Sequence, residues 1–299
     1  EIIEEGTKAD GSPWRIGVIN LPSFYMDMAA ARQGQADYKS STRDCRELLE
    51  GFREEGVDCV ALDLRNNGGG SLPESISLTG LFIDTGPVVQ IKDADQRVQQ
   101  YDDLEPGVVW DGPLVVLVNK FSASASEIVA GAIQDYRRGL VIGDSATHGK
   151  GTVQRNVAFG KPLDAMGIQT EYGAVKLTFQ KFYRVTGSST QRKGVVPDVV
   201  FPDDYEFLKY REKDNPSALP WDEMERAKFS PWTSSNEIAT IAAKANNKIK
   251  NDTATIRFKK NLQWISAQVD KSVALEINKY RQYKKEIQNV IQQNENILK

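Results

Sequence analysis

The stretch Leu114-Val-Val-Leu-Val-Asn-Lys-Phe-Ser-Ala-Ser-Ala-Ser-Glu127 contains the strongest indication of the fold. Its first five residues are continuously apolar, which predicts a strand buried on both faces. The small polar residues that follow predict a turn, and a helix is expected from about residue 126 to 137. A buried strand that leads through a turn directly into a helix is typical of an α/β sheet with parallel strands.

The same order of strand, turn and helix occurs upstream. Residues 57–64 predict a buried strand, the turn Arg65-Asn-Asn-Gly-Gly-Gly70 follows it, and a helix is expected over 73–82. Further elements are expected as strands at 15–21, 139–142, 153–159 and 174–185, a hairpin at 88–92 and 97–101, and a helix at 43–55 with Thr42 as its N-cap. This pattern predicts an α/β core with largely parallel pairing, in which reactive groups gather at the carboxyl ends of the strands.

The composition changes near residue 203, after which Lys, Asn, Gln and Glu dominate. Apolar residues then recur at helical spacing in three groups, which are Ile238, Ile241, Ala245 and Ile249; Leu262, Ile265, Val269 and Val273; and Tyr280, Tyr283, Ile287 and Val290. We therefore expect an all-α C-terminal extension of two or three amphipathic helices. Packing of these stripes on the core or on one another is favoured over a surface for a partner.

Composition excludes several classes of protein. Lys and Arg number 38 against 41 Asp and Glu in 299 residues, so the chain is not a strongly basic protein that coats nucleic acid. One His and two Cys exclude a His-rich metal site, a zinc ribbon and a disulfide scaffold, while Cys45 and Cys59 can either pair or stay free. No apolar run is long enough to span a membrane, and no signal peptide follows Glu1, so we interpret the chain as a fragment.

Candidate catalytic residues lie in the serine-rich turn and in Gly149-Lys-Gly-Thr-Val-Gln154. A Ser at a strand-to-helix turn is exposed, and the N–H groups of the helix N-terminus stabilise an anion that develops there. An N-cap Ser without catalytic function explains the turn equally well. Lys150 favours catalysis, because a Gly-flanked lysine that becomes buried has a lowered pKa and can act as a base, with Gln154 able to orient its amine.

The region around Lys150 also contains a Gly-Lys pair, as a P-loop does, and a histidine, His148. The segment from Gly143 to Thr152 does not have P-loop spacing, because five residues separate its glycines and Gly follows Lys. His148 is expected to be a solvated loop side chain rather than a base, since no motif places an Asp to orient it. The Gly68–Gly70 run is a tight turn, a source of N–H donors for an oxyanion, or both.

Four motifs in order resemble the C-terminal processing peptidases, family S41, and especially their tail-specific subgroup. The motifs are Asp63-Leu-Arg-Asn-Asn-Gly-Gly-Gly70, Ser122-Ala-Ser-Ala-Ser-Glu127, Gly149-Lys-Gly-Thr-Val-Gln154, and Phe182-Tyr-Arg-Val-Thr-Gly-Ser-Ser-Thr-Gln191 followed by Gly194-Val-Val-Pro-Asp198. The resemblance implies a crotonase-like or ClpP-like α/β serine protease core with mixed sheets at 14–202. A remnant at 1–13 would precede this core, and a helical C-terminal domain at 203–299 would follow it.

The resemblance also implies the site residues. They are Ser124 as nucleophile, Lys150 as general base, Gln154 as the residue that orients Lys150, and the backbone N–H groups of Gly70 and Ala125 as the oxyanion hole. Ser122 and Ser126 are weaker candidates for the nucleophile, because the family's serine directly precedes Ala-Ser-Glu. The implied mechanism is an acyl-enzyme mechanism that needs no metal or organic cofactor.

Substrates and location follow from the same resemblance. It implies proteins with apolar, poorly folded C-terminal tails as substrates, a periplasmic location, and an adaptor protein or a second copy as further partners, with no nucleic acid. The PDZ domain and the N-terminal domain found in relatives are expected to be missing from these residues. Two alternatives stay open: a non-catalytic scaffold that binds a chain terminus, and a crotonase-like enzyme that transfers acyl groups from thioesters.

Overall fold

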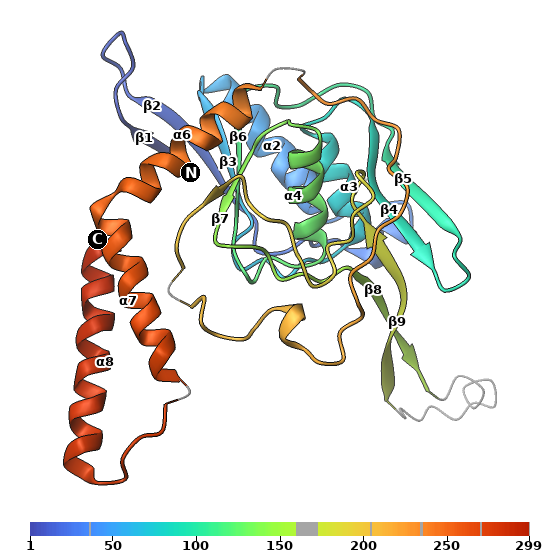
Figure 1. Ribbon diagram of the computed structural model, residues 1–299. Coiled ribbons are helices and arrows are strands. Elements are labelled where there is room, and N and C mark those ends of the chain that lie inside the picture. The colour runs from blue at the N-terminus through green and yellow to red at the C-terminus, as the bar shows by residue number, and fades with distance from the viewer. Residues whose placement is uncertain (36, 160–172, 204, 234–235, 270, 299) are drawn as a thin grey trace.

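Two β-sheets form the core of the protein, whose computed structural model describes residues 1–299 except 36, 160–172, 204, 234–235, 270 and 299 (Figure 1). The larger sheet has the order β1 (Ile2–Glu5), β2 (Trp14–Asn20), β3 (Cys59–Asp63), β6 (Leu114–Val118), β7 (Leu140–Gly143) and β10 (Val199–Val200). Its strands are parallel except for the antiparallel pair β1–β2. The smaller sheet is antiparallel, in the order β5 (Val98–Asp103), β4 (Gly86–Asp93), β9 (Ala174–Tyr183) and β8 (Thr152–Ala158). The predicted α/β class with mixed sheets is confirmed.

Helix α4 (Ala125–Asp135) lies between the two sheets, and all its residues from Ala125 to Ile133 are buried. Val129 and Ile133 join the core of the larger sheet, together with α2 (Ser41–Glu54) and α3 (Leu72–Gly80). Ile128 and Ala132 join the core of the smaller sheet. The N-terminus of α4 is therefore fixed from both sides, which makes it a rigid position for a reactive side chain.

Strands β3, β6 and β7 are neighbours and run parallel, so their carboxyl ends meet at one edge of the sheet. The chain leaves β3 through the glycine run, leaves β6 through the serine-rich turn, and leaves β7 through residues 144–151 toward β8. The motifs that the sequence analysis singled out are brought together by this topology, as expected for a parallel sheet.

The structure corrects the expected N-cap of α2 and shows whether the two cysteines are paired. The N-cap of α2 is Ser40 and not Thr42, because Thr42 lies inside the helix and its N–H donates to Glu74 Oε2 at 2.7 Å. Cys45 and Cys59 are both free thiols.

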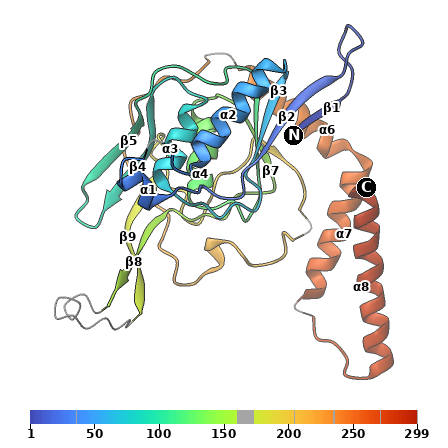
Figure 2. The ribbon, with the colours of Figure 1, turned by 180° about the vertical axis from the view of Figure 1, so that it is seen from behind.

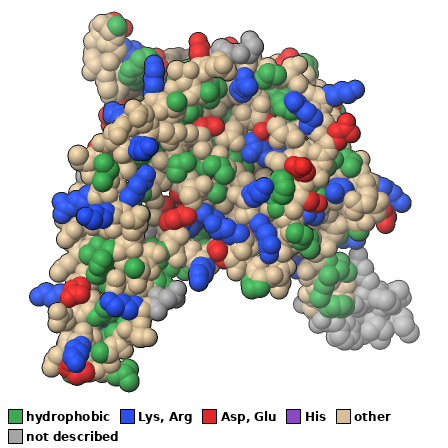
Figure 3. Space-filling view, viewed as in Figure 1, with side chains coloured by type: hydrophobic (Ala, Val, Ile, Leu, Met, Phe, Trp, Pro, Cys, Tyr) green, Lys and Arg blue, Asp and Glu red, His purple; other side chains and the backbone are tan. Residues whose placement is uncertain are grey.

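The C-terminal extension contains three helices in the described residues, which are α6 (Glu237–Asn251), α7 (Thr253–Val269) and α8 (Ile277–Leu298). Helix α6 contacts β10, while α7 and α8 form an antiparallel hairpin that projects away from the core (Figures 1 and 2). Helix α7 ends at Val269, so the expected stripe does not continue to Val273 within it. Figure 3 shows hydrophobic side chains interspersed with Lys and Arg over this hairpin. None of the helices in the described ranges is long and apolar enough to cross a membrane.

The chain between β10 and α6 is mostly irregular and runs across the core. Backbone hydrogen bonds attach it at several points, among them Glu212 N to His148 O at 3.0 Å, Ala227 N to Val185 O at 2.8 Å and Trp232 N to Tyr136 O at 2.7 Å. The described residues of this segment include one 3₁₀ turn, η1 (Glu212–Asp214). The helical extension is thus joined to the core by chain that is itself packed on it.

Candidate active site

Ser124 is the N-cap residue of α4 and has an unusual backbone conformation. Its φ of 58° and ψ of −112° lie in a region that residues with a side chain rarely occupy, and strain of this kind costs on the order of 1–3 kcal/mol. Ser124 and Glu127 form a capping box, in which Ser124 N donates to Glu127 Oε2 at 2.8 Å, but capping alone does not explain the unusual backbone of Ser124. A strained serine with a free hydroxyl at the end of a buried strand is typical of a nucleophile.

The neighbouring serines have structural roles. Ser122 Oγ donates to Leu64 O at 2.8 Å, and Ser126 Oγ donates to Asn67 O at 2.8 Å, with both side chains fully buried. These two serines attach the turn before α4 to the turn after β3. Neither hydroxyl is available to attack a substrate.

The glycine run lies directly beside Ser124. A Cβ on Gly69, whose φ is +104°, would be 2.9 Å from Ser124 Cβ, and a Cβ on Gly70, whose φ is +150°, would be 2.3 Å from Phe24 O. Only glycine fits at these two positions. Among the hydrogen bonds of the described residues, the N–H groups of Gly70 and Ala125 donate to no protein acceptor. Gly70 and Ala125 both line the cavity at Ser124, and unpaired N–H groups of this kind are the donors that an oxyanion hole requires.

Asn67 fixes the shape of this turn, and the sequence analysis gave it no role. Its amide oxygen accepts from Gly69 N at 2.9 Å, and its amide nitrogen donates to Leu21 O at 2.8 Å. Its backbone oxygen accepts from Ala123 N at 3.0 Å, on the serine side. The side chain is fully buried, so one asparagine connects the glycine run, the serine turn and β2's exit.

Lys150 lines the same cavity of about 200 Å³, together with Gln154 and a second lysine, Lys176. Burial lowers the pKa of the Lys150 amine below its usual value, and the charge of Lys176 lowers it further, while Glu212 and Glu127 oppose the shift. A lysine with a lowered pKa reaches its neutral form at a lower pH than a free lysine does, and in that form it can accept a proton.

Ser124, Lys150 and Gln154 line one cavity, but their side chains do not contact one another through hydrogen bonds. Within the described structure, no hydrogen bond joins Ser124 Oγ, the Lys150 amine and Gln154. Gln154 Nε2 donates to Thr178 Oγ1 at 3.1 Å, which leaves the Gln154 oxygen free. A bulge in the β8–β9 pairing lies at Val153/Gln154, a distortion common beside active sites because it redirects a side chain.

Glu127 connects the serine turn with the lysine loop. One carboxylate oxygen accepts from Ser124 N at 2.8 Å and Lys150 N at 3.0 Å, and the other accepts from Thr147 Oγ1 at 2.6 Å and Gly149 N at 2.7 Å. Complete burial raises the pKa of Glu127 to about 7, against the opposing effect of these four donors. The position of Glu127 three residues after Ser124 is a capping-box spacing, which is the sequence signal that could have indicated this role.

His148 differs from the expectation of a solvated side chain. It is half-buried, its Nε2 lies 3.6 Å from Glu212 Oε2, and burial lowers the pKa of its imidazole. The prediction was wrong because Glu212, which covers the ring, is distant in sequence. His148 is absent from the residues that line the cavity at Ser124.

The chain is similar to known proteases along most of its length. The family model for peptidase family S41 matches residues 15–201, and the model for the C-terminal domain of tail specific protease matches residues 205–299. The tail-specific protease of Haemophilus influenzae is 43% identical over 216 residues, which are 72% of this chain and 28% of that protein. The carboxy-terminal-processing protease of Bartonella bacilliformis is 36% identical over 166 residues, which are 55% of this chain and 35% of that protein.

A solved structure is similar as well. The photosystem II D1 C-terminal processing protease has a TM-score of 0.52 and 28% sequence identity, with 70% of this chain and 47% of that chain covered. The chain therefore spans about a third of the length of these two curated relatives and about half of the solved one.

Proposed function

Because the chain belongs to peptidase family S41, we propose that it is the catalytic part of a C-terminal processing serine endopeptidase of the tail-specific type. One observation carries the proposal: Ser124, a lysine with a lowered pKa and two unpaired N–H groups line the same cavity. Nucleophile, base and oxyanion donors are the three components that acyl transfer requires.

In the proposed reaction the neutral amine of Lys150 takes the proton of Ser124 Oγ as the oxygen attacks the substrate carbonyl. The carbonyl oxygen becomes an anion and accepts hydrogen bonds from Gly70 N and Ala125 N. The C–N bond then breaks, the Lys150 ammonium gives its proton to the leaving amine, and an acyl-enzyme remains. Water attacks the ester with Lys150 again as base, which releases the acid and restores Ser124.

Gln154 is proposed to orient Lys150. Its amide nitrogen is held by Thr178, so its oxygen remains as an acceptor. An ammonium formed at Lys150 can donate to that oxygen, which stabilises the protonated base between the two proton transfers. Lys150 must turn toward Ser124 during the reaction, because the two side chains make no hydrogen bond in the described structure.

The cavity also supports a substrate class. Apolar side chains from four elements line it beside Ser124, which are Leu72, Ile128, Val153 and Phe182. At about 200 Å³ it accepts a small or medium apolar side chain and offers no acidic lining residue for a basic one. We therefore propose cleavage after apolar residues of unfolded chains, including apolar C-terminal tails. A periplasmic location is proposed only from the resemblance to bacterial tail-specific proteases.

Covalent labelling tests the proposal. A fluorophosphonate probe should label the folded chain, and Ser124→Ala should abolish labelling. Ser12→Ala is the matched control, since Ser12 is partly exposed and does not line the cavity, and it should label as the wild type does. A folded wild-type chain that is not labelled would favour the chain-terminus-binding scaffold instead.

A further inference from the structure

We propose that residues 205–214, which lie outside the part matched by the peptidase family model, position the loop that carries Lys150. The proposal rests on the proposed function, in which Lys150 is the base. The loop comprises residues 144–151, between β7 and β8. Glu127 holds it from the core side, and the 205–214 segment holds it from the opposite side.

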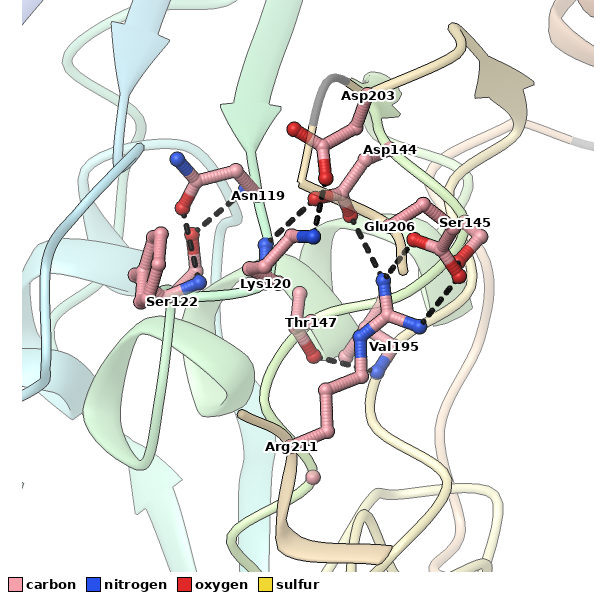
Figure 4. A network of polar contacts seen from close by, with 12 residues as sticks. Asn119, Lys120, Ser122, Asp144, Ser145, Thr147, Val195, Asp203, Glu206 and Arg211 are labelled. Carbon is pink, nitrogen blue, oxygen red and sulfur yellow. Dashed lines mark hydrogen bonds and ion pairs between the residues drawn. The ribbon is translucent and has the colours of Figure 1, made fainter. Parts of the chain in front are cut away.

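The first end of the loop is held by Arg211 (Figure 4). The Arg211 guanidinium is buried and lies 3.5 Å from Asp144 Oδ1 and 3.0 Å from Glu206 Oε2. Asp144 is also buried and accepts from Lys120 N at 2.8 Å, while Ser145 Oγ donates to Glu206 Oε1 at 2.7 Å. Arg211 therefore neutralises the one carboxylate at the start of the loop and attaches the loop to the segment.

The second end of the loop is held by Glu212. Its N–H donates to His148 O at 3.0 Å, and its Oε1 accepts from Gln191 Nε2 at 3.0 Å. Gln191 is fully buried, and its own Oε1 accepts from Gly151 N at 2.8 Å. Glu212 thus fixes the backbone on both sides of Lys150, once directly and once through Gln191.

The same segment reaches the serine turn. The ring of Tyr210 lies 6.0 Å from the ring of Phe121, centroid to centroid, and Phe121 immediately precedes Ser122 in that turn. Buried Lys120, one residue earlier, pairs with Asp203, which lies two residues before the segment. The segment therefore contacts both the serine turn and the loop that carries Lys150. These contacts explain how the C-terminal domain supports the chemistry at Ser124, although none of its described residues lines that cavity.

The charge of Glu212 can be tested separately from its structural role, because that charge acts on the pKa of Lys150 and so on the pH dependence of kcat/KM. The charged groups that act on Lys150 are Lys176, which lowers its pKa, and Glu127 and Glu212, which raise it. His148 Nε2 lies 3.6 Å from Glu212 Oε2, and the charges of Glu212 and Lys150 both act on its imidazole. Glu212→Gln keeps an acceptor for Gln191 but removes the charge, so the pKa of Lys150 falls. The acidic limb of the kcat/KM profile should then move to lower pH, with kcat at the optimum within about 3-fold of wild type.

Glu212→Ala removes the acceptor as well. We expect kcat to fall at least 10-fold and KM to change less than 3-fold, since no residue lining the cavity is altered. Lys213→Ala, an exposed neighbour in the same segment, is the matched control and should match wild type in both constants. Amide hydrogen exchange at residues 148–151 should be faster in Glu212→Ala than in Lys213→Ala.

The outcomes separate this proposal from the proposed function. A wild-type chain that hydrolyses no peptide and is not labelled at Ser124 refutes the proposed function, and exchange at 148–151 still decides whether Glu212 positions the loop. Glu212→Ala with wild-type kcat and wild-type exchange overturns the proposal. If Glu212→Ala does not fold, Glu212→Gln decides, and an unmoved acidic limb in that variant overturns it.

Discussion

Lys176 and Lys150 share one cavity, and the charge of Lys176 is one cause of the lowered pKa of Lys150. In the proposed mechanism Lys150 acts as the free amine, so the rate is expected to rise with pH through its pKa. Removing the neighbouring positive charge raises that pKa, and Lys176→Gln should therefore move the acidic limb of kcat/KM to higher pH. The measurement is peptide hydrolysis between pH 6 and 10, with exposed Lys209→Gln as control. A limb that moves to lower pH would contradict Lys150 as the base.

The carboxylate of Glu127 accepts from four donors, which the amide of a glutamine cannot do with both of its terminal atoms. Glu127→Gln places an NH₂ group against donors, so at least one buried contact is lost at about 1–3 kcal/mol. We expect a loss of that size in the free energy of unfolding and a fall in kcat of at least 10-fold. Chemical denaturation and peptide hydrolysis measure the two effects, with exposed Glu47→Gln on α2 as control. Unchanged kcat in Glu127→Gln would show that the link between the two loops is not needed for catalysis.

The sequence predicted those candidate site residues that lie in short local motifs. Ser124 and Lys150 were recognisable because each lies in a short motif next to a strand, and the structure places both at one cavity. Gln191 and Glu212 were not recognisable as contacts of the loop that carries Lys150, because they are distant from it in sequence. Gln191 lies 40 residues after Gly151, and Glu212 lies 21 residues after Gln191. Such long-range contacts depend on the folded chain and not on any pattern within a window.

Among the elements, the turn after β3 depends most strictly on its glycines. Gly70→Ala would place a Cβ 2.3 Å from Phe24 O at a φ of +150°, so we expect at least about 2 kcal/mol of lost stability. Gly68→Ala is the matched control for folding, because a Cβ there meets no atom within 4 Å. Thermal unfolding of the two variants measures the difference. Equal unfolding temperatures would mean that the turn relaxes and that its shape is not fixed by Phe24.

Helix α2 shows why element boundaries are harder to predict than elements. The apolar residues Leu48, Leu49 and Phe52 indicated a helix correctly, and Leu49 and Phe52 are buried, but Leu48 is 45% exposed. The start of the helix depends on Glu74 in α3, whose carboxylate accepts from Ser40 Oγ, Ser41 Oγ and Thr42 N. Three consecutive hydroxyl residues are equivalent N-cap candidates in the sequence, and a glutamate from another helix decides among them.

At the scale of the whole molecule, burial is distributed unevenly. Helix α4 is buried along nine consecutive residues, whereas the described residues of α7 contain three buried side chains, Phe258, Ile265 and Gln268. In the described part of α8 only Asn294 is buried, and it accepts from Asn261 at 2.8 Å across the hairpin. Large apolar side chains on the hairpin, such as Val269 and Ile291, remain more than 40% exposed. The projecting hairpin therefore has much less hydrophobic stabilisation than the core.

This asymmetry predicts the order in which the chain opens. Burial of one Leu or Ile side chain contributes about 1.5–3 kcal/mol, and an isolated helical hairpin with few such residues is marginally stable. We expect amides in α8 to exchange with solvent at least 100-fold faster than amides in β6, because local opening of the hairpin leaves the core intact. Hydrogen exchange at two protein concentrations measures this and detects a second copy, which would slow exchange in α8 as the concentration rises. Protection of α8 equal to that of β6 at low concentration would mean that the hairpin unfolds only together with the protease core.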